Sequence, residues 1–266
     1  MTLDLDELTS GWDCPPGEIR ARVVVGRDGH ELLQLRIDLG VMQMQPQGRP
    51  DGQRCHGLAS ARDFVAHELH VGTRSLSEED WDELEREITQ VNYRRMAYAT
   101  LAEDALHADD PDAARRFLRG ALVDVEFCLA ELALLARREP LGGEYATLRA
   151  TLVFDHARLR TQLHIVNERY EDAIEEAERG AAHLARVLAE FGYDEEQQAD
   201  DPGVSYLREL SRRLRSEYGI RRTLRERLAE AIAHEDFEQA ALLRDELEQR
   251  EPLGPGGEEA PDPSWN

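Results

Sequence analysis

Residues Leu224–Leu247 read LRERLAEAIAHEDFEQAALLRDEL and encode two short amphipathic helices joined by an acidic turn. In the first helix, Leu224, Leu228 and Ile232 recur every four residues, which places them on one face. Asp236 is a suitable N-cap for the second helix, and the glutamine three residues later would complete a capping box. This stretch therefore predicts a helical hairpin.

The second predicted helix carries apolar side chains that we expect to pack against the first. These side chains are Phe237, Ala240, Ala241 and Leu247. Arg244 lies where a charged side chain would flank the contact. A hairpin of about 30 residues buries too little surface to be stable alone, so it must pack on its own body, on another copy or on a partner. The pattern also fits a hairpin that only caps the fold.

Within this stretch, EDFEQAALLRDEL (residues 235–247) resembles the UVR motif, the helical hairpin named for the UvrB and UvrC subunits of excision repair. The resemblance implies docking to a second UVR hairpin, on a partner or on another copy of the chain. Such hairpins join the helicase to the nuclease in excision repair. Similar motifs occur in an activator of a bacterial protein-arginine kinase and in Clp-type unfoldases. The implied partner-binding residues are Leu224, Leu228, Ile232, Phe237, Ala240, Ala241, Arg244 and Leu247.

The charge of the chain restricts its partners and its chemistry. The net charge is -23, which argues against broad binding to nucleic acid or anionic membranes. All 32 basic residues are arginine, so a phosphate-binding loop that needs lysine and a Schiff-base mechanism are both excluded. The segment Arg208–Arg227 is a local exception, with eight arginines and three glutamates. It fits a helix face paired with the acidic remainder, a site for an acidic partner, or a nucleic-acid contact.

Residues 1–60 predict a small β-meander. Apolar residues alternate through Ile19–Asp38, and Asp28-Gly29 between the two runs is a type I′ turn signal. Val41–Gln45 would add a third strand. We expect this sheet to lean on the helices, because it is too small to stand alone.

Residues 61–192 predict a bundle with four long helices, separated by breaks near residues 109, 140 and 168. The segments ADDPDAARRFLRGAL and NERYEDAIEEAERGA resemble the second helix of tetratricopeptide (TPR) repeats. Ala113 and Ala173 are 60 residues apart, whereas the usual TPR repeat is about 34 residues long. We therefore expect a TPR-like bundle, either with a peptide-binding groove or as a plain scaffold.

The predicted fold class is mainly α: a TPR-like bundle with a small N-terminal antiparallel sheet and a C-terminal UVR hairpin. Residues 193–203 look like an acidic linker, residues 204–251 add a helix before the hairpin, and residues 252–266 are expected to be disordered. The whole chain also resembles, more loosely, a group of bacterial UVR-motif proteins, through LQLRIDLGVMQM (residues 33–44) and GRPDG (residues 48–52). With no signal-peptide pattern, no long apolar run and no disulfide framework, we expect a cytoplasmic protein.

Side chains that could bind a metal occur in the N-terminal third. They are Cys14, Cys55, His56, His67 and His70. No CxxC pair is present, and His67 and His70 are three residues apart instead of the four of a HExxH motif. We expect no metal, no cofactor and no catalytic residue. The first hypothesis is thus a non-enzymatic adaptor in excision repair or Clp-type protein quality control. The alternative is a metal-dependent hydrolase that uses the Cys14/Cys55/His56 region.

Overall fold

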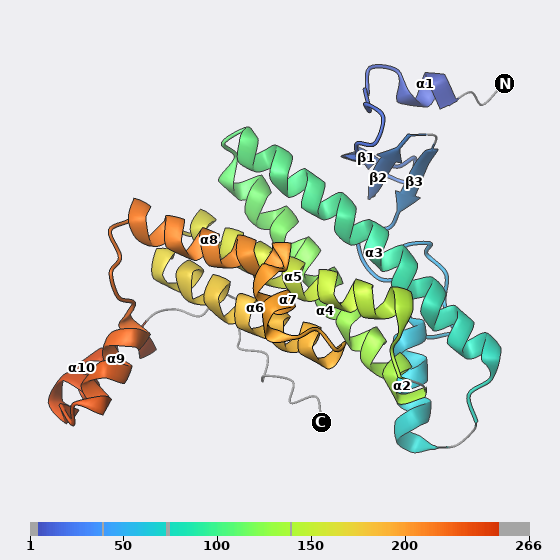
Figure 1. Cartoon of the computed structure of the whole chain (residues 1–266). Coiled ribbons are helices and arrows are strands. Elements are labelled where there is room, and N and C mark those ends of the chain that lie inside the picture. The colour runs from blue at the N-terminus through green and yellow to red at the C-terminus, as the bar shows by residue number, and fades with distance from the viewer. Residues whose placement is uncertain (1–4, 39, 73–74, 139, 250–266) are drawn as a thin grey trace. The chain divides into compact units, whose positions relative to one another are not determined.

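The computed structural model of the chain (Figure 1) describes residues 5–38, 40–72, 75–138 and 140–249. This part of the chain forms ten helices and one three-stranded antiparallel sheet, which confirms the predicted fold class. It divides into two compact units, Met1–Leu152 and Val153–Asn266. The sheet and the first two long helices belong to the first unit. The expected disorder of residues 252–266 lies outside the described residues.

The N-terminal sheet is a meander of β1 (Arg20–Val25), β2 (Glu31–Ile37) and β3 (Gly40–Met44), paired in that order. The predicted strands are therefore confirmed. The first connection is not the expected type I′ turn, which needs positive φ at both central residues. Gly29 has a φ of 82°, but Asp28 is not left-handed. The turn is closed instead by the Gly29 N–H, which donates to the Gly26 carbonyl at 3.0 Å.

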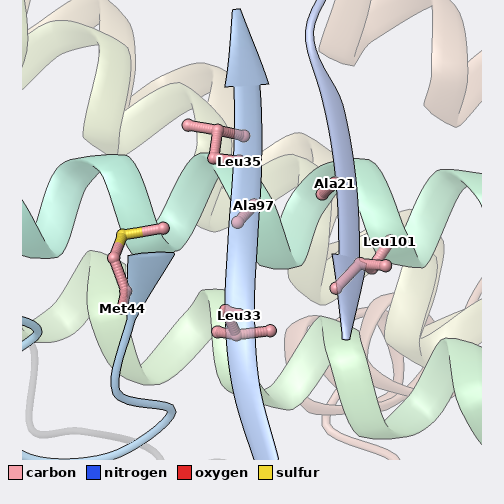
Figure 2. Close-up of a cluster of buried hydrophobic side chains, with 6 residues drawn as sticks. All are labelled: Ala21, Leu33, Leu35, Met44, Ala97 and Leu101. Atoms are coloured by element: carbon pink, nitrogen blue, oxygen red, sulfur yellow. The ribbon is translucent and has the colours of Figure 1, made fainter. Parts of the chain in front are cut away.

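The inner face of the sheet packs against α3 (Glu78–His107), as Figure 2 shows. Alternation along each strand brings every second side chain to this face. The buried residues of the cluster are Ala21, Leu33, Leu35, Met44, Ala97 and Leu101. The sheet thus completes its core with a helix, as its small size requires.

A buried ion pair fixes the loop after β3 to the helices. The Arg94 guanidinium of α3 donates to both carboxylate oxygens of Asp124 in α4 (Pro111–Arg138), and its Nη2 lies 2.7 Å from Oδ1. The same guanidinium donates to the carbonyls of Gln45 and Gly48 in the loop. One side chain therefore ties together the sheet, α3 and α4.

The four long helices predicted for the middle of the chain are present. They are α3, α4, α5 (Gly143–Val166) and α6 (Tyr170–Glu190). In unit 1, the start of α3 meets the end of α4, where Arg138 pairs with Glu78 at 2.6 Å, so these helices are antiparallel. In unit 2, Gly180 of α6 lies against Ala157 of α5. The likeness to TPR repeats remains a prediction.

Unit 2 continues with α8 (Pro202–Glu217), which packs against α6. The shared apolar cluster contains Ala173, Ile174, Leu210 and Leu214, with Ile165 and Ile220 packed against it. The region expected to be an acidic linker contains a short helix, α7 (Glu195–Asp200). Asp194 caps this helix, because its side chain accepts from the Gln197 N–H at 2.9 Å.

Two further short helices were not predicted individually. Helix α1 (Leu5–Thr9) precedes the sheet, and α2 (Ala61–Val71) begins at the N-cap Ser60. Within the described residues, no helix is long and apolar enough to cross a membrane.

Candidate functional site

The C-terminal hairpin consists of α9 (Leu224–Ala233) and α10 (Phe237–Glu248), which lie side by side (Figure 1). Thr223 caps α9 in a capping box with Glu226, and this box satisfies N–H groups that the first turn leaves free. Asp236 caps α10, where its side chain accepts from the Gln239 N–H at 3.1 Å. The predicted cap is confirmed, but the structure records no reciprocal bond from the Gln239 side chain.

The turn of this hairpin repeats the turns between the long helices. Glu235 is left-handed with a φ of 59°, as are Asp109 between α3 and α4 and Glu168 between α5 and α6. In each turn, the next N–H donates to a carbonyl five residues earlier, as from Asp236 to Ala231 at 2.9 Å. Five residues after each left-handed residue, a buried alanine enters the contact: Ala114, Ala173 and Ala240. The turn geometry therefore sets which residues of the second helix face the first.

The contact between α9 and α10 is a small apolar seam. Its fully buried members are Leu224, Ala231, Ala240 and Leu243. Leu228 and Leu247 are half-buried and pack against them. Leu243, which the sequence had not placed there, is 2% exposed. The seam residues span two turns of each helix. The remaining apolar side chains of the hairpin lie outside the seam.

The prediction that Phe237 faces the first helix was wrong, because its side chain is 69% exposed. Phe237 is the first residue of α10 and does not belong to the apolar seam. Ile232 is 49% exposed and Ala241 is also exposed, so these two lie outside the seam as well. Since α-helical residues advance by about 100° each, Phe237 and Ala241 share a face of α10 beside the seam.

The eight residues implied by the UVR resemblance thus fall into two groups. Those in or packed against the seam are Leu224, Leu228, Ala240 and Leu247. Those exposed to solvent are Ile232, Phe237, Ala241 and Arg244. The second group presents the larger exposed surface to a partner while the hairpin stays closed. Leu242, 65% exposed on another side of α10, is an apolar residue that the sequence analysis had not singled out.

The arginine-rich segment before and within α9 is half neutralised by the chain itself. The ion pairs formed by its side chains are Arg212–Glu209, Arg215–Glu178, Arg215–Glu226, Arg222–Glu230 and Arg225–Glu175. Among the described residues, no carboxylate pairs with Arg208, Arg213, Arg221 or Arg227. The pairing supports the interpretation of this segment as a helix face that neutralises nearby acids.

The candidate metal ligands do not converge. The Cys14 thiol donates to the carbonyls of Glu18 and Arg36, at 3.3 and 3.8 Å. His56 lies beside Asp80, with Nε2 2.8 Å from Oδ1. Cys55 is buried, and burial raises the pKa of its thiol. In the described part of the chain, no three His, Cys, Asp or Glu side chains form a metal-binding group.

One pair of buried carboxyl groups was not predicted from the sequence. Glu87 of α3 and Glu131 of α4 are both fully buried. Glu87 Oε2 accepts from the Ala61 and Arg62 N–H groups at the start of α2, at 2.7 and 3.1 Å. Burial and the adjacent Glu87 raise the pKa of Glu131 to about 10, so one proton stays in the pair at neutral pH. Neither carboxyl reaches solvent, which leaves it without access to a substrate in this conformation.

The hairpin also matches a known family. A family model described as the UvrB/uvrC motif matches residues 220–249, which contain α9, its N-cap and α10. No curated protein and no solved structure matches the chain significantly. The family match covers the hairpin alone and does not extend to the sheet or the long helices. With its two capped helices and closed apolar seam, the C-terminal hairpin of this chain is a UVR motif.

Proposed function

We propose that this protein is a non-enzymatic adaptor that docks a cytoplasmic protein partner through the hairpin of α9 and α10. The observation that carries the proposal is the exposed ring of Phe237 within the UVR motif. Aromatic side chains are enriched among the residues that dominate protein interfaces, since each buries a large apolar area on contact. Removing this ring from water would stabilise a complex without opening the seam.

The equivalent residue of the body supports this role for Phe237. Tyr170 also stands two residues after a left-handed turn residue and begins its helix, α6. Its ring stacks on Tyr218, at the end of α8, with the ring centroids 3.6 Å apart. A helix of the body therefore covers the aromatic residue at this position. We infer that a helix of the partner covers Phe237 in the same way.

The UVR resemblance suggests the kind of partner. A second UVR-type hairpin, in another protein or another copy of this chain, would supply helices of the required kind. The resemblance leaves two pathways open, excision repair and Clp-type proteolysis. The helical body would act as the scaffold that carries the hairpin, with or without a peptide-binding groove of its own. The net charge of -23 disfavours nucleic acid as the partner.

The test measures association of the full chain. Light scattering after size-exclusion chromatography detects self-association, and biolayer interferometry detects binding to purified UvrB, UvrC and a Clp-type unfoldase. We expect one of these associations to occur, and we expect Phe237→Asp to abolish it. A charge placed in an apolar contact must lose its hydration without gaining a partner.

Leu242→Asp is the matched control, because Leu242 is equally exposed but lies about 140° around α10 from Phe237. It should retain association. Circular dichroism verifies that both variants fold. The proposal fails if the chain binds neither itself nor these partners, or if Phe237→Asp binds as the wild type does.

A further inference from the structure

Three glutamates of α6 form an acidic stripe that faces the base of the hairpin. Glu171, Glu175 and Glu178 are spaced by four and three residues, so they share one helix face. The backbone N–H of Leu224, the first residue of α9, donates to Glu171 Oε2 at 3.2 Å. One turn along the stripe, Glu175 Oε2 lies 3.0 Å from Nε of Arg225. The start of α9 is therefore attached to α6 by polar contacts.

Arg215, near the end of α8, completes this joint. Its Nη2 lies 2.9 Å from Glu178 Oε1 on α6 and 2.7 Å from Glu226 Oε1 on α9. Its Nη1 also donates to the Arg221 carbonyl in the connection between α8 and α9. The hydrogen bond and charge of Arg215 lower the pKa of Glu226, which keeps this carboxylate ionised. One guanidinium thus links the body, the connection and the hairpin.

The apolar packing of the hairpin is separate from this joint. Its cluster is built from residues of α9 and α10 alone. Ile220, three residues before the N-cap Thr223, packs against the cluster between α6 and α8. The hairpin can therefore keep its own seam while its attachment to α6 changes. The carboxylates of the joint also lie near the N-terminus of α9, where the positive end of the helix dipole favours negative charge.

We propose that the acidic stripe sets the direction in which the UVR hairpin is held, with Glu175 and Arg225 as positioning residues for docking. This inference rests on the proposed function, because the direction of the hairpin decides where Phe237 is presented. In the pair with Glu175 the Arg225 side chain is 57% exposed, whereas that of Glu175 is 12% exposed. An ion pair that opens to solvent on one side is individually weak and is weakened further by salt. The joint is therefore a hinge that holds the hairpin in one direction at low ionic strength and releases it at high ionic strength.

The experiment measures the distance between the hairpin and α6 in the full chain, without a partner. Spin labels are attached through Ala182→Cys on α6 and Glu238→Cys on α10, which are both exposed positions. Cys14→Ser removes the half-buried native thiol, and the remaining cysteines, Cys55 and Cys128, are buried. Double electron–electron resonance then gives the distance distribution at ionic strengths of about 0.01 M and about 1 M, where the screening length falls from about 30 Å to about 3 Å.

We expect a narrow distribution at low salt and a broad one at high salt. Arg225→Gln should broaden it at low salt and raise the released fraction roughly fivefold, the effect of losing one favourable pair. Glu175→Arg combined with Arg225→Glu should restore the narrow distribution. Arg212→Gln is the matched control, because Arg212 pairs within α8, with Glu209, and should change nothing.

The proposal is wrong if the distance distribution responds neither to salt nor to Arg225→Gln. It is also wrong if the exchanged pair, Glu175→Arg with Arg225→Glu, gives a distribution as broad as that of Arg225→Gln alone. Circular dichroism shows whether each variant keeps its helices. Because the measurement needs no partner, its outcome is independent of the association tests with Phe237→Asp. If the hairpin keeps one direction at high salt but still binds through Phe237, only the hinge proposal is refuted. If the hairpin is released at high salt but binds no partner, only the adaptor proposal is refuted.

Discussion

Gly180 of α6 lies so close to Ala157 of α5 that a Cβ atom at position 180 would fall 2.2 Å from the Ala157 Cβ. At an unconstrained helix position, replacing glycine by alanine stabilises a protein by about 0.5–1 kcal/mol. We expect Gly180→Ala to destabilise unit 2 instead, by about 1–3 kcal/mol, because the two helices must move apart. Urea unfolding followed by circular dichroism measures the change. Adding Ala157→Gly should recover part of the loss, and a stabilised single variant would contradict the close approach.

The buried pair of Arg94 and Asp124 predicts a large loss in unit 1. Asp124→Ala leaves the guanidinium of Arg94 buried without its carboxylate, which costs about 3–5 kcal/mol in comparable pairs. Trp81 is buried in α3, so its fluorescence during urea unfolding reports on this unit. Glu18→Ala removes an exposed ion pair of the same unit, with Arg20, and should cost less than about 1 kcal/mol. Equal effects of the two substitutions would show that the buried pair contributes no more than a surface one.

Periodicity and chain breaks were sufficient to predict the main elements. The alternation in residues 19–38 predicted the meander, and Asp109 and Pro111 marked the break between α3 and α4. These signals are local, because helix and strand periods act over a few residues. The sequence likeness between the segments around Gly120 and Gly180 also corresponds to a shared feature of the structure. Both glycines meet a residue of the preceding helix, Tyr98 and Ala157 respectively.

The features that the sequence did not reveal depend on how elements are oriented. Phe237 and Ala240 are both apolar, and only the geometry of the turn at Glu235 decides which of them enters the seam. Glu87 and Glu131 belong to different helices. Glu87 stands among other acids, whereas Glu131 stands in the apolar run Phe127–Ala136. Their pairing is a tertiary contact without a local signal. Helical periodicity shows which residues share a face of a helix, but not which neighbouring element that face contacts.

The carboxyl pair predicts an unusual pH dependence for unit 1. The folded pKa of Glu131, about 10, lies above its ordinary value of 4.5, so the folded state holds this proton more tightly than the unfolded chain. The free energy of unfolding should therefore fall as pH rises from 4.5 to 10, by at most about 1.4 kcal/mol per pH unit. Glu131→Gln removes this slope and should stabilise the protein at neutral and mildly alkaline pH.

Urea unfolding monitored by Trp81 fluorescence across this range tests the effect of Glu131→Gln. Glu79→Gln, at an exposed position of α3, is the control and should keep the wild-type slope. A Glu131→Gln variant that is less stable than the wild type at alkaline pH would show that the carboxyl is ionised and bound by a partner.

His164 predicts the opposite dependence for unit 2. Burial lowers the pKa of its imidazole from 6.5 to about 4. Between these two pH values His164 is therefore protonated in the unfolded chain and neutral in the folded chain. The stability of unit 2 should therefore fall as pH drops from 6.5 to 4. Hydrogen exchange of α6 peptides over this range measures the effect. His164→Gln should flatten the dependence, whereas His234→Gln, at an exposed position, should not; equal profiles for the two variants would rule out His164 as the cause.

The closed seam and the exposed ring predict different results for two aspartate substitutions in α10. Ala240 is 2% exposed, so Ala240→Asp places a carboxylate in the seam and should cost several kcal/mol, as burial of unpaired charges does. Phe237→Asp leaves the seam intact and puts an acid in the first turn of α10, where the helix dipole favours it. Hydrogen exchange of residues 224–247 in the full chain should therefore lose protection in Ala240→Asp and keep it in Phe237→Asp. If both variants lose protection equally, Phe237 is part of the packed fold, and the hairpin is a structural cap instead of a docking element.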